Sequence, residues 1–168
     1  MTIPAFMLRG PDILSRWRLI ALLFLLFSFF SVAGAAKTAA LPEGAEKISL
    51  QRGMQQIAVF TVETVSYQRG LQKGLAGRPR IPDDFGMLFV LDSTRDQFFW
   101  MNGVEFPLDI LFFDKDKKLI EVLADLLPCE ECPKYRAPAH TAYALEINAG
   151  MADALGIKRG DSLVFTNK

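Results

Sequence analysis

Short apolar and β-branched runs, separated by polar turns, recur along the chain from residue 56 onward. Runs of this length and composition predict β-strands. The predicted strands are Gln56–Val65, Phe85–Leu91, Gln97–Met101, Leu108–Asp114, Lys118–Leu126, Thr141–Asn148 and Asp161–Thr166. Two short helices are also expected: one over Tyr67–Lys73 after the cap residue Ser66, and one over Gly150–Leu155 that Gly156 ends.

The connections between these strands are short, and no long crossover helix separates them. Tight connections favour antiparallel pairing, and the polar turn Asp114–Lys117 predicts a hairpin between the two strands that flank it. The pattern therefore predicts an α+β fold, in which a small, β-rich, mostly antiparallel sheet curls into a partial barrel and carries two short helices.

The N-terminus has the pattern of a secretory signal peptide. Three arginines precede an apolar run at Leu19–Ala33, and the small residues Ala33-Gly34-Ala35 follow. We expect residues 1–35 to be removed on export to the periplasm or the medium. Residues 36–55 would form a linker with a short strand near Ile48–Leu50, and residues 56–168 one globular domain. The alternative is an uncleaved anchor over residues 19–36, because that run spans about 27 Å as a helix against a hydrocarbon core of about 30 Å.

The charge of the exported part argues against one class of partner. Removing the three arginines and one aspartate of residues 1–35 from the totals of 19 basic and 19 acidic residues leaves 16 and 18, a charge near −2. No basic run remains to attract a polyanion, so we expect no nucleic-acid partner. Membrane contact is expected only through the N-terminal segment, if that segment is not cleaved.

Asp109 is the first candidate for chemistry, because it interrupts an apolar strand. Its neighbours on both faces of that strand are apolar, so we expect Asp109 to be buried. A buried carboxylate needs partners, since leaving it unpaired costs several kcal/mol. One interpretation is a structural acceptor for backbone N–H groups or an arginine; the other is a site carboxylate with a tuned pKa.

Glu146 repeats this pattern on a later strand. It shares a face with Ala142 and Ala144, which suit a concave surface or a closely packed neighbour. If Asp109 and Glu146 faced one cleft, they would form an acid pair of the kind used in general acid–base catalysis. A salt bridge from either carboxylate to Arg78 is an equally good interpretation.

Three further residues complete the candidate polar cluster. Arg78 follows a glycine-containing loop and could present its guanidinium to a carboxylate, or could be an ordinary exposed arginine. Trp100 could stack on a ligand such as a sugar, or could belong to the core. Asn102 precedes Gly103, and this pair is typical of a turn.

Cys129 and Cys132 lie in a loop between Pro128 and Pro133. In an exported protein we expect them to form a disulfide that pins this loop. A redox role is disfavoured, since two glutamates lie between the cysteines and Pro133 follows them. We expect no metal and no cofactor, because His140 is the only histidine and no second cysteine pair accompanies it.

Several ordered tracts together resemble the domain-of-unknown-function family numbered 192. The resemblance covers about residues 55–166, with Ala76 where many members carry methionine, and it implies a compact β-rich α+β fold but no reaction. By position it extends to Arg78, Trp100, Asn102, Asp109 and Glu146. The tracts are GLAGR at 74–78, GMLFV at 86–90, FWMN at 99–102, PLDILFFD at 107–114, LEINAG at 145–150, Gly156-Ile157 and Gly160-Asp161.

Three functions remain open from the sequence, and whether the protein is an enzyme is undecided. The first is an exported domain that binds a small polar ligand or an envelope protein. The second is an envelope-associated hydrolase or transferase that uses Asp109 and Glu146 as its carboxylate pair. The third is a thiol–disulfide role for Cys129 and Cys132.

Overall fold

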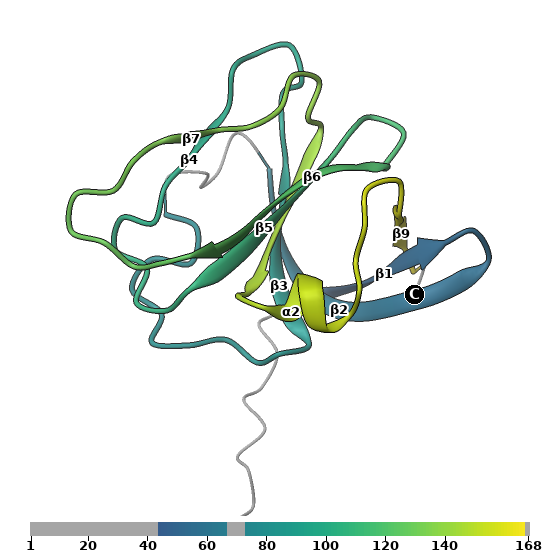
Figure 1. The fold of residues 1–168 in the computed structure, drawn as a ribbon, viewed down its shortest axis with the longest axis horizontal. Helices are drawn as coiled ribbons and strands as arrows, with labels where there is room; N and C mark the ends of the chain where they lie inside the picture. The colour runs from purple at the N-terminus through teal and green to yellow at the C-terminus, as the bar shows by residue number, and fades with distance from the viewer. Residues whose placement is uncertain (1–43, 67–72, 167–168) are drawn as a thin grey trace, which may run out of the picture. The chain divides into compact units, whose positions relative to one another are not determined.

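A computed structural model describes residues 44–66 and 73–166, all of which lie in the unit formed by Leu41–Lys168 (Figure 1). The predicted signal peptide and residues 36–43 of the predicted linker lie outside the described residues. The rest of that linker contains a strand over Glu46–Arg52, which includes the predicted strand near Ile48–Leu50. Among the described residues, no helix is long and apolar enough to cross a membrane. The elements in chain order are β1 (Glu46–Arg52), β2 (Gln55–Ser66), β3 (Phe85–Val90), β4 (Phe98–Phe99), β5 (Leu108–Phe113), β6 (Leu119–Leu126), β7 (Tyr135–Arg136), β8 (Tyr143–Asn148), α2 (Met151–Ala154) and β9 (Ser162–Phe165).

Seven strands form one sheet in the order β6-β5-β8-β3-β2-β1-β9, and β4 pairs with β7 in a separate two-stranded sheet (Figure 1). Every pair in the large sheet is antiparallel except β2 and β3, which run parallel. The predicted β-rich, mostly antiparallel fold is therefore confirmed. The sheet is not a closed barrel. Of the two predicted helices, α2 lies within Gly150–Leu155, whereas Tyr67–Lys73 falls largely on residues 67–72, outside the described residues.

The hairpin that joins β5 to β6 confirms the prediction from the polar turn at Asp114–Lys117. One carboxylate oxygen of Asp114 accepts the backbone N–H groups of Asp116 and Lys118, each at 2.9 Å. Lys117 adopts the left-handed region at φ 61°. Short polar side chains that bond nearby backbone groups stabilise such turns, so this carboxylate fixes the point at which the chain reverses.

Both faces of the large sheet are covered by apolar side chains. On β5, Leu111 and Phe113 belong to one buried cluster, while Leu108, Ile110 and Phe112 belong to the other. Successive side chains of a strand point to opposite faces, which explains this division. We call these the first core, which also contains Ala152 of α2, and the second core, which also contains Phe89 and Phe99.

The parallel pairing of β2 and β3 determines where the loop between them must run. Parallel neighbours need a connection that crosses from the end of one strand to the start of the next. This crossover contains Gly74–Arg78, and Gly77 donates its backbone N–H to the carbonyl of Gly103 at 2.8 Å. This contact helps to hold Gly74–Arg78 against the face of the sheet that carries the second core, although the segment is far from β8 in sequence.

Candidate functional site

Asp109 is fully buried, as the sequence predicts, and both of its carboxylate oxygens are satisfied by the backbone. Oδ1 accepts the N–H of Asp125 at 3.0 Å, and Oδ2 accepts the N–H of Ala152 at 2.9 Å. The register between β5 and β6 shifts between Leu108 and Ile110, which leaves the Asp125 N–H for a side-chain acceptor. Asp109 therefore acts as a structural acceptor that joins β5 to β6 and α2.

Glu146 is also buried, with 7% of its surface exposed, but its carboxyl group is not satisfied. Within the described part of the chain, Oε2 is the one buried side-chain nitrogen or oxygen without a hydrogen-bond partner. Burial raises the pKa of Glu146 from 4.5 to about 8, because desolvation disfavours the charged form of its carboxyl group. Near neutral pH the group is therefore mostly a neutral carboxylic acid.

The two acids lie on opposite faces of the sheet. In the pairing of β5 with β8, Asp109 is opposite Ile147 and Ile110 is opposite Glu146. Directly paired residues share a face, so Asp109 faces the first core and Glu146 the second. The predicted carboxylate pair is therefore wrong: two groups separated by the sheet cannot flank one scissile bond.

Glu146 lies directly behind the backbone of Gly74. A Cβ atom built on Gly74 would be 3.6 Å from Oε2 of Glu146 and 3.7 Å from Cζ of Phe89. Gly74 adopts φ +47°, in the left-handed region that favours glycine. The glycine of the GLAGR tract therefore brings backbone close to a buried carboxyl group.

Two hollows of the surface share Lys73 and Gly74. The larger has a volume of about 290 Å³ and is lined further by Glu63, Arg78 and Met87; we call it the Gly74 recess. The smaller, the aromatic hollow, measures about 30 Å³, room for roughly one water molecule, and is lined by Phe98, Trp100 and Asn102 among others. Glu146 does not line the Gly74 recess, but it is paired with Met87 across β3 and β8 and lies close to Gly74, and both of these residues do line it.

Arg78 forms its ion pair with Glu63, a residue of β2. Its Nη2 atom donates to Oε2 of Glu63 at 2.6 Å, and its guanidinium carbon lies 5.9 Å from the centroid of the Phe85 ring. The predicted salt bridge from Arg78 to Asp109 or Glu146 is therefore wrong. Each of the paired side chains keeps about one third of its surface exposed, so solvent screens the pair.

Trp100 and Asn102 lie on the segment that forms one wall of the aromatic hollow. The predicted turn at Asn102-Gly103 is present: Val104 donates its N–H to the carbonyl of Met101 at 3.0 Å, and Gly103 has φ 74°. Lys134 lies over the Trp100 ring, with its Nζ atom 5.9 Å from the ring centroid. The structure thus gathers Arg78, Trp100, Asn102 and Glu146 around Lys73 and Gly74, and leaves Asp109 out.

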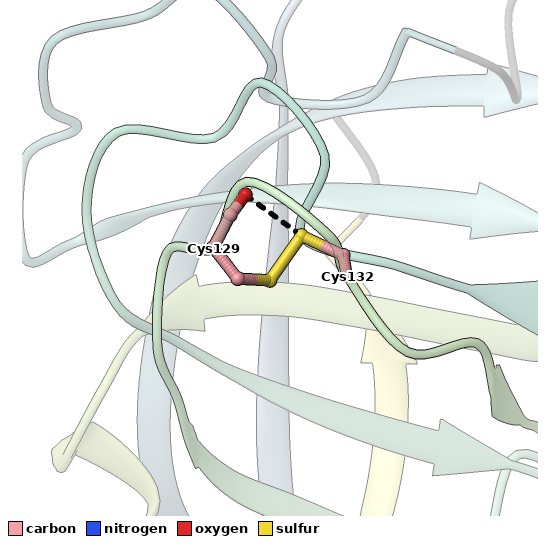
Figure 2. Close-up of a disulfide and its surroundings, with 2 residues drawn as sticks. All are labelled: Cys129 and Cys132. Carbon is pink, nitrogen blue, oxygen red and sulfur yellow. Dashed lines mark hydrogen bonds between the residues drawn. A yellow bond between two sulfur atoms is a disulfide. The ribbon is translucent and has the colours of Figure 1, made fainter.

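Cys129 and Cys132 form a disulfide with their Cα atoms 5.3 Å apart (Figure 2). Sγ of Cys132 lies 3.0 Å from the carbonyl oxygen of Cys129, the contact that the dashed line in Figure 2 marks. It is a sulfur–oxygen contact, because a disulfide sulfur carries no proton. Cys129 forms a backbone bridge with Asn102, and Tyr135 pairs with Phe99. The disulfide loop therefore supports the wall that carries Trp100.

Sequence reasoning missed Glu63, Lys73, Gly74 and Phe98 as parts of this region. Phe98 is the clearest omission, because it keeps 47% of its surface exposed at the edge of the aromatic hollow. The glycines that precede Arg78 indicated that backbone comes close to another group at this point. They did not indicate that this group is the carboxyl group of Glu146. In the described residues, no group of three or more His, Cys, Asp and Glu side chains is arranged to hold a metal ion.

Solved structures include similar chains of comparable length. A protein of unknown function from Novosphingobium aromaticivorans DSM 12444 is 29% identical with a TM-score of 0.68; the match covers 76% of this chain and 91% of that one. A Sinorhizobium meliloti 1021 protein, described as a proposed transcription regulator, is 30% identical with a TM-score of 0.66, covering 72% of this chain and 93% of that one. Among curated proteins no relative matches. The model of the family described as DUF192, "Uncharacterized ACR, COG1430", matches residues 48–165, so the chain belongs to this family.

Proposed function

We propose that this protein is an exported, non-enzymatic module that binds a small polar ligand at the Gly74 recess. The observation that carries the proposal is Oε2 of Glu146, which is buried behind Gly74 without a hydrogen-bond partner among the described residues. Native proteins satisfy nearly all buried polar groups, because an unmade hydrogen bond costs about 1–3 kcal/mol. A ligand that bonds this carboxyl group would recover that free energy.

The composition of the surroundings supports a binding site. Ligand sites combine apolar walls with a few convergent polar groups. The Gly74 recess has Val65, Ala76 and Met87 as apolar lining, with Lys73 and Arg78 as polar groups. Its volume of about 290 Å³ is at the lower end of the range for ligand pockets, roughly 300–1,000 Å³, which favours a small ligand.

The proposal includes the location and the shape of the domain. The N-terminal arginines, apolar run and small-residue exit support export to the periplasm or the medium, with an envelope protein as the other class of partner. Backbone hydrogen bonds from Leu119 to Asp161 and from Leu163 to Lys117, at 2.8 and 2.9 Å, support a sheet that curls toward a partial barrel. We do not propose a role in transcription for this chain, although the Sinorhizobium protein is described as a regulator, because no basic run that could bind nucleic acid follows residue 35.

The test is a binding screen by thermal shift and calorimetry with neutral sugars, amino acids and small carboxylic acids. Glu146→Met removes the carboxyl group but keeps an apolar side chain, so the variant should fold at least as stably as the wild type. We expect its affinity for a compound that the wild type binds to fall at least about tenfold. Glu121→Gln, an exposed position on β6, is the matched control and should bind normally.

Two results would overturn the proposal. One is a screen in which the wild type binds no compound of any class. The other is a ligand that Glu146→Met binds as tightly as the wild type does.

A further inference from the structure

The charged groups that line the Gly74 recess restrict the class of ligand. Lys73 and Arg78 are cations, Glu63 is an anion, and no other charged side chain among the described residues lines this hollow. Glu146 lies behind Gly74, and no cation among the described residues pairs with it, so burial favours the neutral form of its carboxyl group. Counted over the described residues, the lining therefore carries two cations and one anion, and a ligand with a single negative charge would balance that excess.

Arg78 is oriented before any ligand binds. Glu63 holds its Nη2 atom at 2.6 Å, and the Phe85 ring lies beside the guanidinium with its centroid at 5.9 Å. A guanidinium has about five N–H donors, and this ion pair uses one of them. The remaining donors suit the planar, two-oxygen shape of a carboxylate.

Glu146 adds a donor of a different kind. A protonated carboxyl group offers one O–H, and its strongest acceptor is an ionised oxygen. Lys73, by contrast, would repel an ammonium ligand from the same hollow. Two cations and an acidic O–H thus favour an acceptor-rich anion over an amine or an uncharged molecule.

We infer that the ligand of the Gly74 recess is a small carboxylic acid, whose carboxylate is bound by Lys73 and Arg78 on the outer side of Gly74, opposite the buried Glu146. This inference rests on the proposed function, because it specifies the ligand of the same site. It assigns Lys73 and Arg78 as the groups that select the charge of the ligand, and Glu63 as the group that limits how strongly Arg78 binds it.

Matched probes test the class of ligand. Glucuronate, glucose and glucosamine share one ring and differ in charge, as do lactate, lactamide and 1-amino-2-propanol. Calorimetry and NMR titration of the full chain should show the acid of a set binding at least about tenfold more tightly than its amine, the equivalent of one charge-assisted hydrogen bond.

Two substitutions should move the affinity in opposite directions. Lys73→Gln should weaken binding of the acid several-fold, whereas Glu63→Gln should strengthen it, because the Arg78 guanidinium is then released from its partner. Lys115→Gln, on the exposed turn before β6, is the matched control and should leave the affinity unchanged.

The outcomes separate this inference from the proposed function. If the amine or the neutral probe binds best through Glu146, the charge assignment is overturned and the binding module stands. If acids bind but Lys73→Gln and Glu63→Gln have no effect, the assignment of Lys73 and Arg78 is overturned. If no probe of any charge binds the wild type, both the inference and the proposed function fail.

Discussion

Asp109 and Glu146 are buried carboxylic acids on neighbouring strands, yet their surroundings differ. Asp109 faces the first core, where the backbone N–H groups of Asp125 and Ala152 satisfy both of its oxygens. Glu146 faces the second core, where Oε2 has no partner among the described residues and Gly74 covers it. Asp109 thus holds three elements together, whereas the carboxyl group of Glu146 lacks a hydrogen-bond partner for Oε2 among the described residues.

The difference shows that burial alone does not identify a functional acid. Both residues interrupt apolar strands in the same way, and the sequence pattern treats them alike. What distinguishes them is the supply of donors on each face, since a buried carboxylate that accepts two backbone hydrogen bonds is already at low free energy. A carboxyl group without donors keeps its capacity to bond an incoming molecule.

The largest effect is expected from Asp109→Ala. This change leaves the N–H groups of Asp125 and Ala152 buried without an acceptor. The free energy of unfolding should fall by about 3–4 kcal/mol, measured by urea denaturation. The free energy of unfolding of Asp109→Asn should lie between those of Asp109→Ala and the wild type, because the carboxamide keeps one acceptor oxygen. A loss below about 1 kcal/mol for the alanine variant would mean that Asp109 does not hold these elements together.

The second effect is a pH dependence of stability caused by Glu146. Its pKa in the folded protein is about 8, above the ordinary value of 4.5 in the unfolded chain, because the charged form is poorly solvated. The folded state therefore binds more protons between these values. The contribution of Glu146 protonation to the free energy of unfolding is fully present below pH 4.5. It decreases by at most about 1.4 kcal/mol per pH unit as pH rises toward 8, and above that pH the free energy of unfolding no longer changes through this group.

Urea denaturation from pH 4 to 9 measures this dependence. Glu146→Gln should remove this part of the slope and be more stable than the wild type at pH 9, while Glu121→Gln should retain it. If Glu146→Gln keeps the slope of the wild type, Glu146 is not the titrating group and its surroundings resemble those of Asp109.

The smallest effect concerns Arg78. A double-mutant cycle with Glu63→Gln and Arg78→Gln should give a coupling below about 1 kcal/mol, because both side chains are about one third exposed. A second cycle, with Glu146→Gln in place of Glu63→Gln, should give a coupling near zero. A coupling of Arg78 to Glu146 as large as that to Glu63 would give Glu146 a partner and remove its contrast with Asp109.

The strands on either side of the polar turn at Asp114–Lys117 could be predicted from sequence because their periodicity is local. The predicted strands Leu108–Asp114 and Lys118–Leu126 correspond to β5 and β6 within one residue at each end. The parallel pairing of β2 with β3, by contrast, depends on contacts between residues far apart in the chain. No local pattern encodes such a pairing, so the prediction of a mostly antiparallel sheet could not say which two strands run parallel.

Only part of the membership of the candidate site could be predicted from sequence, and its geometry could not. Alternation placed Leu108, Ile110 and Phe112 on one face of β5, and it predicted that Asp109 is buried. Whether Asp109 and Glu146 share a face depends on the register between β5 and β8. A shift of one residue in that register would have placed the two carboxyl groups on the same face.

The pairing of β9 with β1 joins the first and last strands of the sheet, with Ile48 opposite Phe165. Because these strands are so far apart in sequence, we expect this edge of the sheet to form late in folding, after the loop between them has closed. Until Phe165 leaves the ribosome, β1 has an unpaired edge that another chain could occupy. Slow synthesis near the C-terminus would prolong that exposure, so we expect the pairing of β9 to protect the nascent protein against aggregation as well as to complete its fold.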